Sequence, residues 1–150
     1  MSFSYYPITF IINTAASFYM LGVIWQIQIL QYPAFQLIDT RSFAKHHAFH
    51  TRRISYVVIL PMLLELGSSF LLLFMSFEPH DTINIIGFLL VISIWASTFF
   101  IQVPLHEKLK NREGDLSENI NRLITTNWLR TLLWSLKAGL SALALLLLFE

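Results

Sequence analysis

The chain has 150 residues, of which 55% are hydrophobic and 13% are charged, and its formal net charge is +1 at pH 7. A soluble domain carries about 25% charged residues to cover its surface, so this composition excludes an ordinary water-soluble domain and indicates a lipid environment. The small net charge argues against nucleic acid as a partner, because phosphate binding needs a surplus of Lys and Arg on one face. Without Cys, the chain cannot form disulfides, Fe–S clusters or thiol nucleophiles.

Four apolar segments predict four transmembrane helices, over residues 8–30, 54–77, 83–103 and 128–149. The first segment has 23 residues, which is about 34 Å as a helix and enough to cross a hydrocarbon core of roughly 30 Å. No Lys or Arg precedes it, and it is longer than the apolar core of a signal peptide, which favours a membrane span. The sequence therefore predicts an all-α, single-domain, antiparallel four-helix bundle that contacts the lipid bilayer.

The distribution of Lys and Arg predicts the orientation of the bundle. Basic residues occupy the stretch between the first two spans and the stretch between the last two: Arg41, Lys45, Arg52, Arg53, Lys108, Lys110, Arg112 and Arg122. The N-terminal tail and the link at residues 78–82 contain none. By the positive-inside rule, both basic segments face the cytoplasm and both termini lie outside, which in a bacterium places the protein in the inner membrane.

Both basic stretches are predicted to be helical extensions of the spans. One helix is expected to begin near Ser42, with its cap within residues 39–42, and another near Glu118, after a turn at residues 114–117. Pro61 is expected to kink the second span, because proline removes one backbone hydrogen bond inside the membrane. The two halves of the chain share the order span, basic stretch, span, and no residue-level match between them is expected.

Histidines gather where the second span begins. At about 100° per residue, His47 and His50 share a helix face, and Glu65 lies eighteen residues after His47, or five turns of an ideal helix. We therefore expect all three side chains to face the bundle interior, with Glu65 protonated or paired there, and Lys137 is one open choice of partner. The alternative is that His and Arg near a membrane boundary only contact lipid headgroups.

The cytoplasmic ends of the third and fourth spans are also polar. Gln102 and His106 end the third span, and Asn127, Arg130 and Trp134 lie on one stripe of the fourth. Because the cytoplasmic ends of the helices approach the same membrane depth, we expect these groups to converge. The predicted site has His47, His50, His106 and Glu65 as catalytic groups and Arg53, Asn127, Arg130, Trp134 and Gln102 as ligand-binding groups.

The type of ligand stays open between a metal ion and an anion. Imidazoles from two helices suit Zn, Cu or Fe, so His47, His50 and His106 are candidate ligands of a transition metal. The positive charges of Arg53 and Arg130 oppose a bare cation and favour an anionic or phenolic ligand. Haem is disfavoured, because its one reasonable axial pair, His50 and His106, lies near the membrane surface. Motifs for nucleotide hydrolysis, serine acyl transfer and zinc proteolysis are absent.

Five short motifs carry a resemblance to known proteins. They are Gln31-Tyr32-Pro33-Ala34-Phe35, His47-x-x-His50-x-x-Arg53-Ile54, Pro61-Met62-Leu63-Leu64-Glu65, Gln102-Val103-Pro104-Leu105-His106 and Thr126-Asn127-Trp128-Leu129-Arg130-Thr131. Over nearly the whole chain they resemble a family of small, uncharacterised bacterial four-span membrane proteins, which implies the fold and the positions of the motifs. The chain is also distantly similar to anthrone-oxygenase-like membrane proteins, and that similarity implies an oxidoreductase acting on a lipophilic phenol.

Three functions remain open at this point. The pocket could bind a lipophilic small molecule, with or without a metal, and carry out oxidation or proton transfer. The protein could instead be a non-catalytic subunit or assembly factor whose polar ends contact a membrane-protein partner or a second copy of the chain. Glu65 and Lys137 could also belong to an ion or proton pathway, although the sequence shows neither the inverted repeat nor the broken helices of a transporter.

Overall fold

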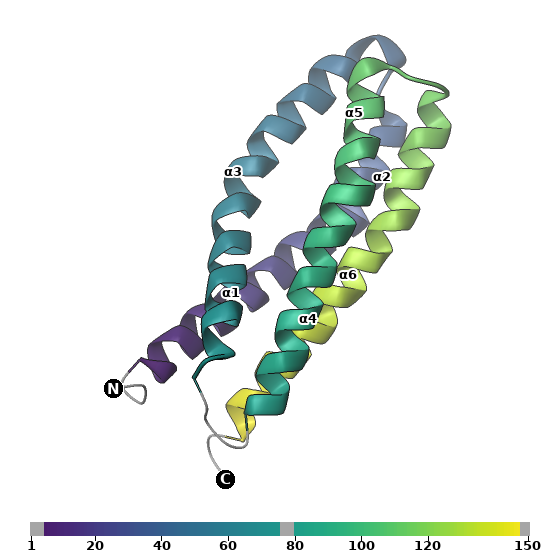
Figure 1. The fold of residues 1–150 in the computed structure, drawn as a ribbon. Coiled ribbons are helices and arrows are strands. Elements are labelled where there is room, and N and C mark those ends of the chain that lie inside the picture. The colour runs from purple at the N-terminus through teal and green to yellow at the C-terminus, as the bar shows by residue number, and fades with distance from the viewer. Residues whose placement is uncertain (1–4, 76–79, 148–150) are drawn as a thin grey trace.

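Four long helical rods pack side by side in the computed structural model, which describes residues 5–75 and 80–147 (Figure 1). The first rod consists of α1 (Tyr6–Gln26), η1 (Ile27–Gln31), α2 (Tyr32–Ala34) and η2 (Phe35–Leu37); the second is α3 (Thr40–Leu72); the third consists of α4 (Asp81–Ser97), η3 (Thr98–Gln102) and α5 (Val103–Asn111); the fourth is α6 (Leu116–Leu146). Consecutive rods run in opposite directions (Figure 1), and the described residues form no strand. The predicted all-α fold is confirmed, while residues 76–77 and 148–149 of the predicted spans lie outside the described residues.

Each rod is long and apolar enough to cross a membrane. At the charged end the helices extend beyond the predicted spans, whereas α3 ends at Leu72 and α6 at Leu146, before the predicted ends at residues 77 and 149. Asp39 caps α3 by accepting the N–H of Arg41 at 2.8 Å, and Asp115 caps α6 by accepting the N–H of Glu118 at 2.7 Å. Such caps satisfy backbone donors that a helix start leaves unpaired. The helical extensions are therefore confirmed, and both begin about two residues earlier than expected.

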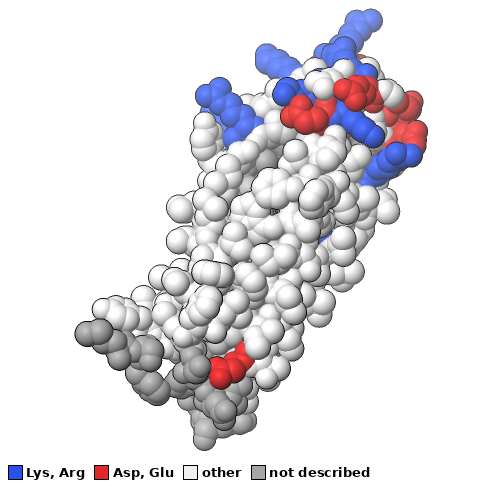
Figure 2. Space-filling model, viewed as in Figure 1, with Lys and Arg blue, Asp and Glu red and all other residues white. Residues whose placement is uncertain are grey.

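Charged side chains gather at one end of the molecule, over the start of α3, the end of α5 and the start of α6 (Figure 2). The surface along the middle of the rods is formed almost entirely by uncharged residues in this view (Figure 2). Many large apolar side chains point outward there, among them Ile11, Leu60, Leu89 and Leu136, each more than half exposed. This apolar surface is that of a multi-pass membrane protein, because the tails of the surrounding lipids, and not water, contact such a surface in a bilayer.

The core consists of three layers along the bundle. The layer at the charged end contains Ile27, Tyr32, Phe35, Phe43, Leu105, Leu109, Ile120 and Leu123. The middle layer contains Met20, Ile24, Met62, Ile94 and Trp134, and the far layer contains Tyr6, Phe10, Leu72 and Ala144. The start of α1 and the end of α6 thus meet in the far layer, opposite the charged end. All four rods contribute side chains to the first two layers, and this packing fixes which face of each helix points into the bundle.

Two π-helical turns interrupt the first and third rods at corresponding places. The turn η1 ends two residues before Pro33, and η3 ends two residues before Pro104. A proline ring clashes with the carbonyl four residues earlier and cannot donate to it, and a widened turn relieves both problems. Gln31 and Gln102 stand two residues before these prolines. The two halves of the chain therefore do share a residue-level match, contrary to the expectation from the sequence. In each half, a π-helical turn ends in a Gln that stands two residues before a Pro.

Pro61 lies inside α3, which continues through it as a single curved helix (Figure 1). The carbonyl of Val57, four residues earlier, cannot receive a hydrogen bond from Pro61 and instead accepts one from the Tyr19 hydroxyl at 3.4 Å. The helix therefore keeps its register across the proline. As a result, Glu65 lies on the same buried face of α3 as His47.

Candidate functional site

Buried polar side chains form two networks inside the bundle. The first, which we call the histidine network, contains Gln28, Tyr32, His47, His50, His106, Asn127 and Arg130. The second, which we call the lysine network, contains Asn13, Ser17, Glu65, Ser68, Ser69, Trp134, Lys137 and Ser141. All of these side chains are buried except His106, which is half-buried. Polar groups of this kind are expensive in a membrane interior, so both networks are candidate sites.

A chain of three hydrogen-bonded side chains forms the centre of the histidine network. The Nε2 atom of His47 lies 3.0 Å from Nδ1 of His106, and Nε2 of His106 lies 3.0 Å from the hydroxyl of Tyr32. An imidazole can donate at one nitrogen and accept at the other. A proton entering at one end of this chain can therefore leave at the other without a movement of heavy atoms.

His50 lies beside this chain without being hydrogen-bonded to it. Its ring stacks on that of His106 with centroids 6.5 Å apart and packs edge-on against Phe35 at 5.1 Å. Its Nε2 atom is buried and has no hydrogen-bond partner among the described residues. The structure thus brings His47, His50 and His106 together, as the sequence predicted.

The three histidines do not have the arrangement of a metal site. Both ring nitrogens of His106 and the Nε2 atom of His47 are held in hydrogen bonds between protein groups. In the part of the chain that the structure describes, no group of three His, Asp or Glu side chains could hold a metal ion. The geometry of the His47–His106–Tyr32 chain is that of a hydrogen-bonded relay between protein groups.

Arg130 adds a buried positive charge to the histidine network. Its Nη1 atom donates to Oδ1 of Asn127 at 3.1 Å, and Nδ2 of Asn127 donates to Oε1 of Gln28 at 2.8 Å. The guanidinium lies beside the Tyr32 hydroxyl and over the ring of Trp134, with Cζ 5.1 Å from the ring centroid.

No carboxylate pairs with this guanidinium among the described residues, whose two salt bridges, Lys110–Glu107 and Arg122–Glu118, lie at the surface. The Nε atom of Arg130 is also buried and unpartnered in the described chain. An unpaired buried cation attracts an anion or a strong hydrogen-bond acceptor. The histidine network is therefore suited to a ligand with a negative or polar group.

Two other predicted ligand-binding residues have different outcomes. Gln102 is buried in η3 and donates from Nε2 to Oγ1 of Thr126 at 3.1 Å, while its Oε1 has no partner among the described residues. Arg53 is exposed, and its Cζ atom lies 5.4 Å from the ring centroid of Phe49. The placement of Arg53 in the site is therefore not supported. Its position on α3 turns it out of the interior, and its long side chain reaches toward the polar surface.

A groove of about 500 Å³ lies between α3 and α5 and reaches the histidine network. His47 and His106 belong to its lining, together with the apolar side chains of Ala44, Ile54 and Val103. Lys110, which pairs with Glu107 at 3.2 Å, lines it as well. The volume is in the range of small-molecule sites, which are mostly apolar with a few polar groups. The groove therefore gives a lipophilic molecule access to the His47–His106 pair.

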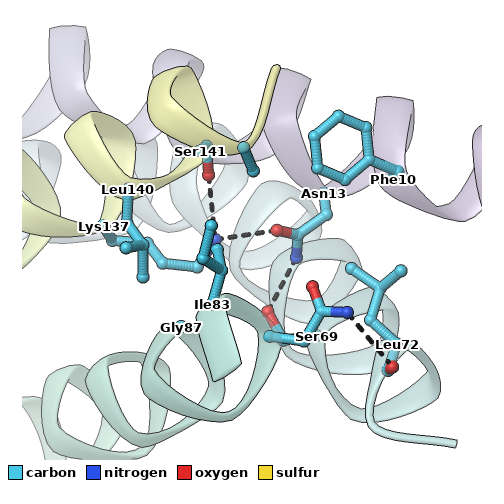
Figure 3. A pocket seen from close by; sticks show the side chains of 11 residues that line it. Phe10, Asn13, Ser69, Leu72, Ile83, Gly87, Lys137, Leu140 and Ser141 are labelled. Atoms are coloured by element: carbon cyan, nitrogen blue, oxygen red, sulfur yellow. Dashed lines mark hydrogen bonds between the residues drawn. The ribbon is translucent and has the colours of Figure 1, made fainter. Parts of the chain in front are cut away.

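The lysine network surrounds Lys137, whose three donors are all used; Figure 3 shows its hydrogen bonds to Asn13 and Ser141. The Nζ atom donates to Oδ1 of Asn13 at 2.7 Å, to Oγ of Ser17 at 3.1 Å and to Oγ of Ser141 at 3.1 Å. Asn13 in turn donates to Ser69 at 2.7 Å and to Ser68 at 2.9 Å. All three hydrogen bonds of the Lys137 ammonium thus go to uncharged side chains.

Glu65 is 1% exposed, which confirms that it faces the bundle interior. Its Oε1 atom lies 2.7 Å from Oγ of Ser17, and its Oε2 accepts the indole N–H of Trp134 at 2.9 Å. Glu65 and Lys137 form no direct ion pair, because the Ser17 hydroxyl stands between them. The open choice of partner for Glu65 is therefore resolved as a bridged pair.

Sequence reasoning missed Ser68 and Ser69 on α3 and Ser141 on α6, and it missed most of the polar residues of the first rod. Asn13, Ser17, Gln28 and Tyr32 supply the groups that connect the predicted residues to one another. Their spacing of four, eleven and four residues keeps them on one helix face. The signal in the sequence that could have found them is this stripe of polar residues along one face of a span that has no charged residue.

None of the protein-family models, curated proteins or solved structures compared with the chain matches it. The functional conclusion rests on the geometry of the two networks.

Proposed function

We propose that the protein binds a lipophilic molecule with a polar or anionic head in the groove between α3 and α5, and that His47 exchanges a proton with the bound head. The observation that carries this proposal is the position of the hydrogen-bonded pair His47–His106 in the lining of a groove of about 500 Å³. The apolar lining of the groove suits the body of such a molecule, and the two imidazoles suit its head.

The hydrogen-bonded chain supports general acid–base chemistry, for which His is the commonest side chain. When His47 gives a proton to the bound head, its Nε2 can take a proton from Nδ1–H of His106, and Nε2 of His106 can take the proton of the Tyr32 hydroxyl, which leaves a phenolate on Tyr32. Arg130 beside Tyr32 stabilises negative charge at that end of the chain. The predicted oxidoreductase activity would also need an electron acceptor, and the arrangement by itself supports binding and proton transfer.

The proposal includes the orientation predicted from Lys and Arg, with the groove at the cytoplasmic side of a bacterial inner membrane. Single cysteines at Ser117, in the basic turn, and at Thr82, at the other end, distinguish the two orientations. We expect a membrane-impermeant thiol reagent added to intact cells to label Thr82→Cys and to leave Ser117→Cys unlabelled. The opposite pattern would place the groove on the outer side.

A photoreactive fatty acid tests the binding proposal in protein reconstituted in nanodiscs. This probe combines an apolar chain with an anionic head. We expect crosslinks, mapped by mass spectrometry, to concentrate on groove residues of α3 and α5. Ala48→Leu, which places a larger side chain in the groove lining, should remove most of this labelling. The matched control is Ala15→Leu, at an exposed position of α1 outside the groove. Labelling spread evenly over the lipid-facing surface, and equal in both variants, would contradict the proposal.

A further inference from the structure

The lysine network contains an acid and a base that share one hydroxyl group. The Oγ atom of Ser17 lies 2.7 Å from Oε1 of Glu65, 3.1 Å from Nζ of Lys137 and 2.9 Å from the carbonyl oxygen of Asn13. Ser17, Glu65 and Lys137 are 0%, 1% and 3% exposed. Charges buried at this depth are costly, which gives the pair a reason to exist in a neutral form as well as in a charged one.

The single proton of the Ser17 hydroxyl has two acceptors available. It can be donated to the Glu65 carboxylate, or to the carbonyl oxygen of Asn13 four residues earlier. In the second case the contact of 2.7 Å between Ser17 and Glu65 is a hydrogen bond only if Glu65 carries a proton and donates it. Both protonation states thus satisfy the same heavy-atom positions.

We propose that Glu65, Ser17 and Lys137 form a proton-binding site in the membrane interior, in which a proton passes between Lys137 and Glu65 through the Ser17 hydroxyl. In the transfer, an N–H bond of the Lys137 ammonium breaks and an O–H bond forms on Ser17. The original O–H bond of Ser17 breaks, and an O–H bond forms on Oε1 of Glu65. The charged pair becomes a neutral acid and amine, and the total charge is unchanged. One further proton converts the neutral pair into an ammonium beside a protonated acid.

The groups that face this site from the neighbouring helices do not titrate near neutral pH. Asn13 and Ser17 come from α1, Asn84 and Gly87 from α4, and Ser68 and Ser69 from α3, while α6 adds Trp134 and Ser141 next to Lys137. Among the other ionisable groups in the described interior, Arg130 lies across the ring of Trp134, His80 contacts the carbonyl oxygen of Ala144 at 2.9 Å, and Tyr6 is hydrogen-bonded to Asn84. The site is therefore an isolated acid–base pair.

Trp134 separates this site from the histidine network. Its indole nitrogen donates to Glu65 and has no lone pair with which to accept a proton. On the other side, Lys137 borders a cavity of about 10 Å³ lined by Asn13, Asn84, Gly87 and Ser141 (Figure 3), which is about the size of one water molecule. Protons therefore reach the pair from the Lys137 side, away from the groove.

Infrared spectroscopy of the full-length protein in nanodiscs tests the proposal, because a protonated carboxylic acid absorbs at a frequency clear of the amide bands. Glutamate labelled with ¹³C at the carboxyl carbon assigns the band to Glu, and its absence from Glu65→Gln assigns it to Glu65. We expect the wild-type band to gain and lose intensity reversibly with pH and to shift in D₂O. A band that is absent, or constant at every pH at which the protein is folded, overturns the proposal without the use of any variant.

Two serine variants separate proton sharing from simple packing. Ser17→Ala removes the shared hydroxyl, whereas the matched control Ser141→Ala removes a hydrogen bond of the same length to Lys137 that does not reach Glu65. We expect Ser17→Ala to change the ratio of protonated to ionised Glu65 about fivefold, the effect of losing a hydrogen bond worth about 1 kcal/mol. Ser141→Ala should change it less than twofold. Equal effects of the two variants overturn the bridging role of Ser17. The result is independent of ligand binding in the groove, so it stands or fails separately from the proposed function.

Discussion

The histidine network and the lysine network are both buried in the same bundle, but they differ in how completely their polar groups are paired. In the histidine network, His50 Nε2 and Arg130 Nε have no partners among the described residues, and a groove of about 500 Å³ reaches the cluster. In the lysine network, each donor of Lys137 is used, and the adjacent cavity measures about 10 Å³.

This difference is why we propose a ligand-binding site at the histidine network and a self-contained proton-binding site at the lysine network. Unpaired buried groups cost free energy unless something binds them, and His50 and Arg130 carry such groups in the network that the groove reaches through His47 and His106. A fully paired network has no free donor or acceptor and no space with which to bind a ligand larger than water. Its remaining freedom is the position of its protons, which is why the two networks support different proposals.

The largest expected effect comes from removing the acid of the lysine network. Glu65→Ala removes the acceptor of the Trp134 indole N–H and the carboxyl group beside Ser17, and it leaves the buried Lys137 without the acid next to it. We expect the free energy of unfolding, measured by denaturant titration in mixed micelles, to fall by about 3 kcal/mol. The control Glu107→Ala removes an exposed partner of Lys110 and should change it by less than about 0.5 kcal/mol. Similar values for both variants would remove the distinction between a buried network and a surface pair.

Filling the two spaces should have unequal consequences. A Cβ atom at Gly87 would lie 3.4 Å from Cε of Lys137, so Gly87→Leu overfills the small cavity and should destabilise the protein by about 2 kcal/mol. Ala48→Leu enters the groove between α3 and α5 and should change stability by less than about 0.5 kcal/mol. Thermal unfolding of both variants measures the contrast. Equal losses would show that the groove is as tightly packed as the cavity.

Trp134 lies between the two networks and should contribute an intermediate amount to stability. Trp134→Phe keeps a ring beneath Arg130 but removes the N–H that donates to Glu65 at 2.9 Å. We expect a loss of about 1.5 kcal/mol in the free energy of unfolding, because the acceptor is a carboxyl group. Trp128→Phe is the control, since Trp128 is 39% exposed and packs edge-on against Trp25. A loss no larger than the control's would mean that the indole N–H does not stabilise Glu65.

The smallest of these effects is expected at the end of the histidine chain. Tyr32→Phe removes the hydroxyl that lies 3.0 Å from Nε2 of His106 and should reduce stability by about 1 kcal/mol. The ¹⁵N chemical shifts of the His106 ring should change at the same time. Tyr56→Phe, at a residue that is 70% exposed, serves as the control and should leave both measurements unchanged. Unaltered His106 shifts in Tyr32→Phe would break the proposed relay.

Local sequence was sufficient for the features that depend on local chemistry. The four spans follow from runs of about 20 apolar residues, which a bilayer requires, and the helix starts follow from Asp39 and Asp115, whose side chains cap the next backbone N–H groups. The meeting of His47 with His106 was also predictable, because antiparallel helices with both residues at their basic ends bring them to one depth. Each of these predictions needs only composition, periodicity and chain direction.

Tertiary structure decided the features that depend on helix rotation and on the distances between helices. Ser17 stands between Glu65 and Lys137, Arg53 turns out of the site, and a groove opens between α3 and α5. Periodicity places a side chain on a helix face, but a change of a few tens of degrees in rotation decides which neighbour it meets. The π-turns before Pro33 and Pro104 add such changes within the first and third rods. The sequence by itself therefore determined the spans and the membrane depth of the predicted polar residues, and packing determined which side chains are buried and which of their atoms touch.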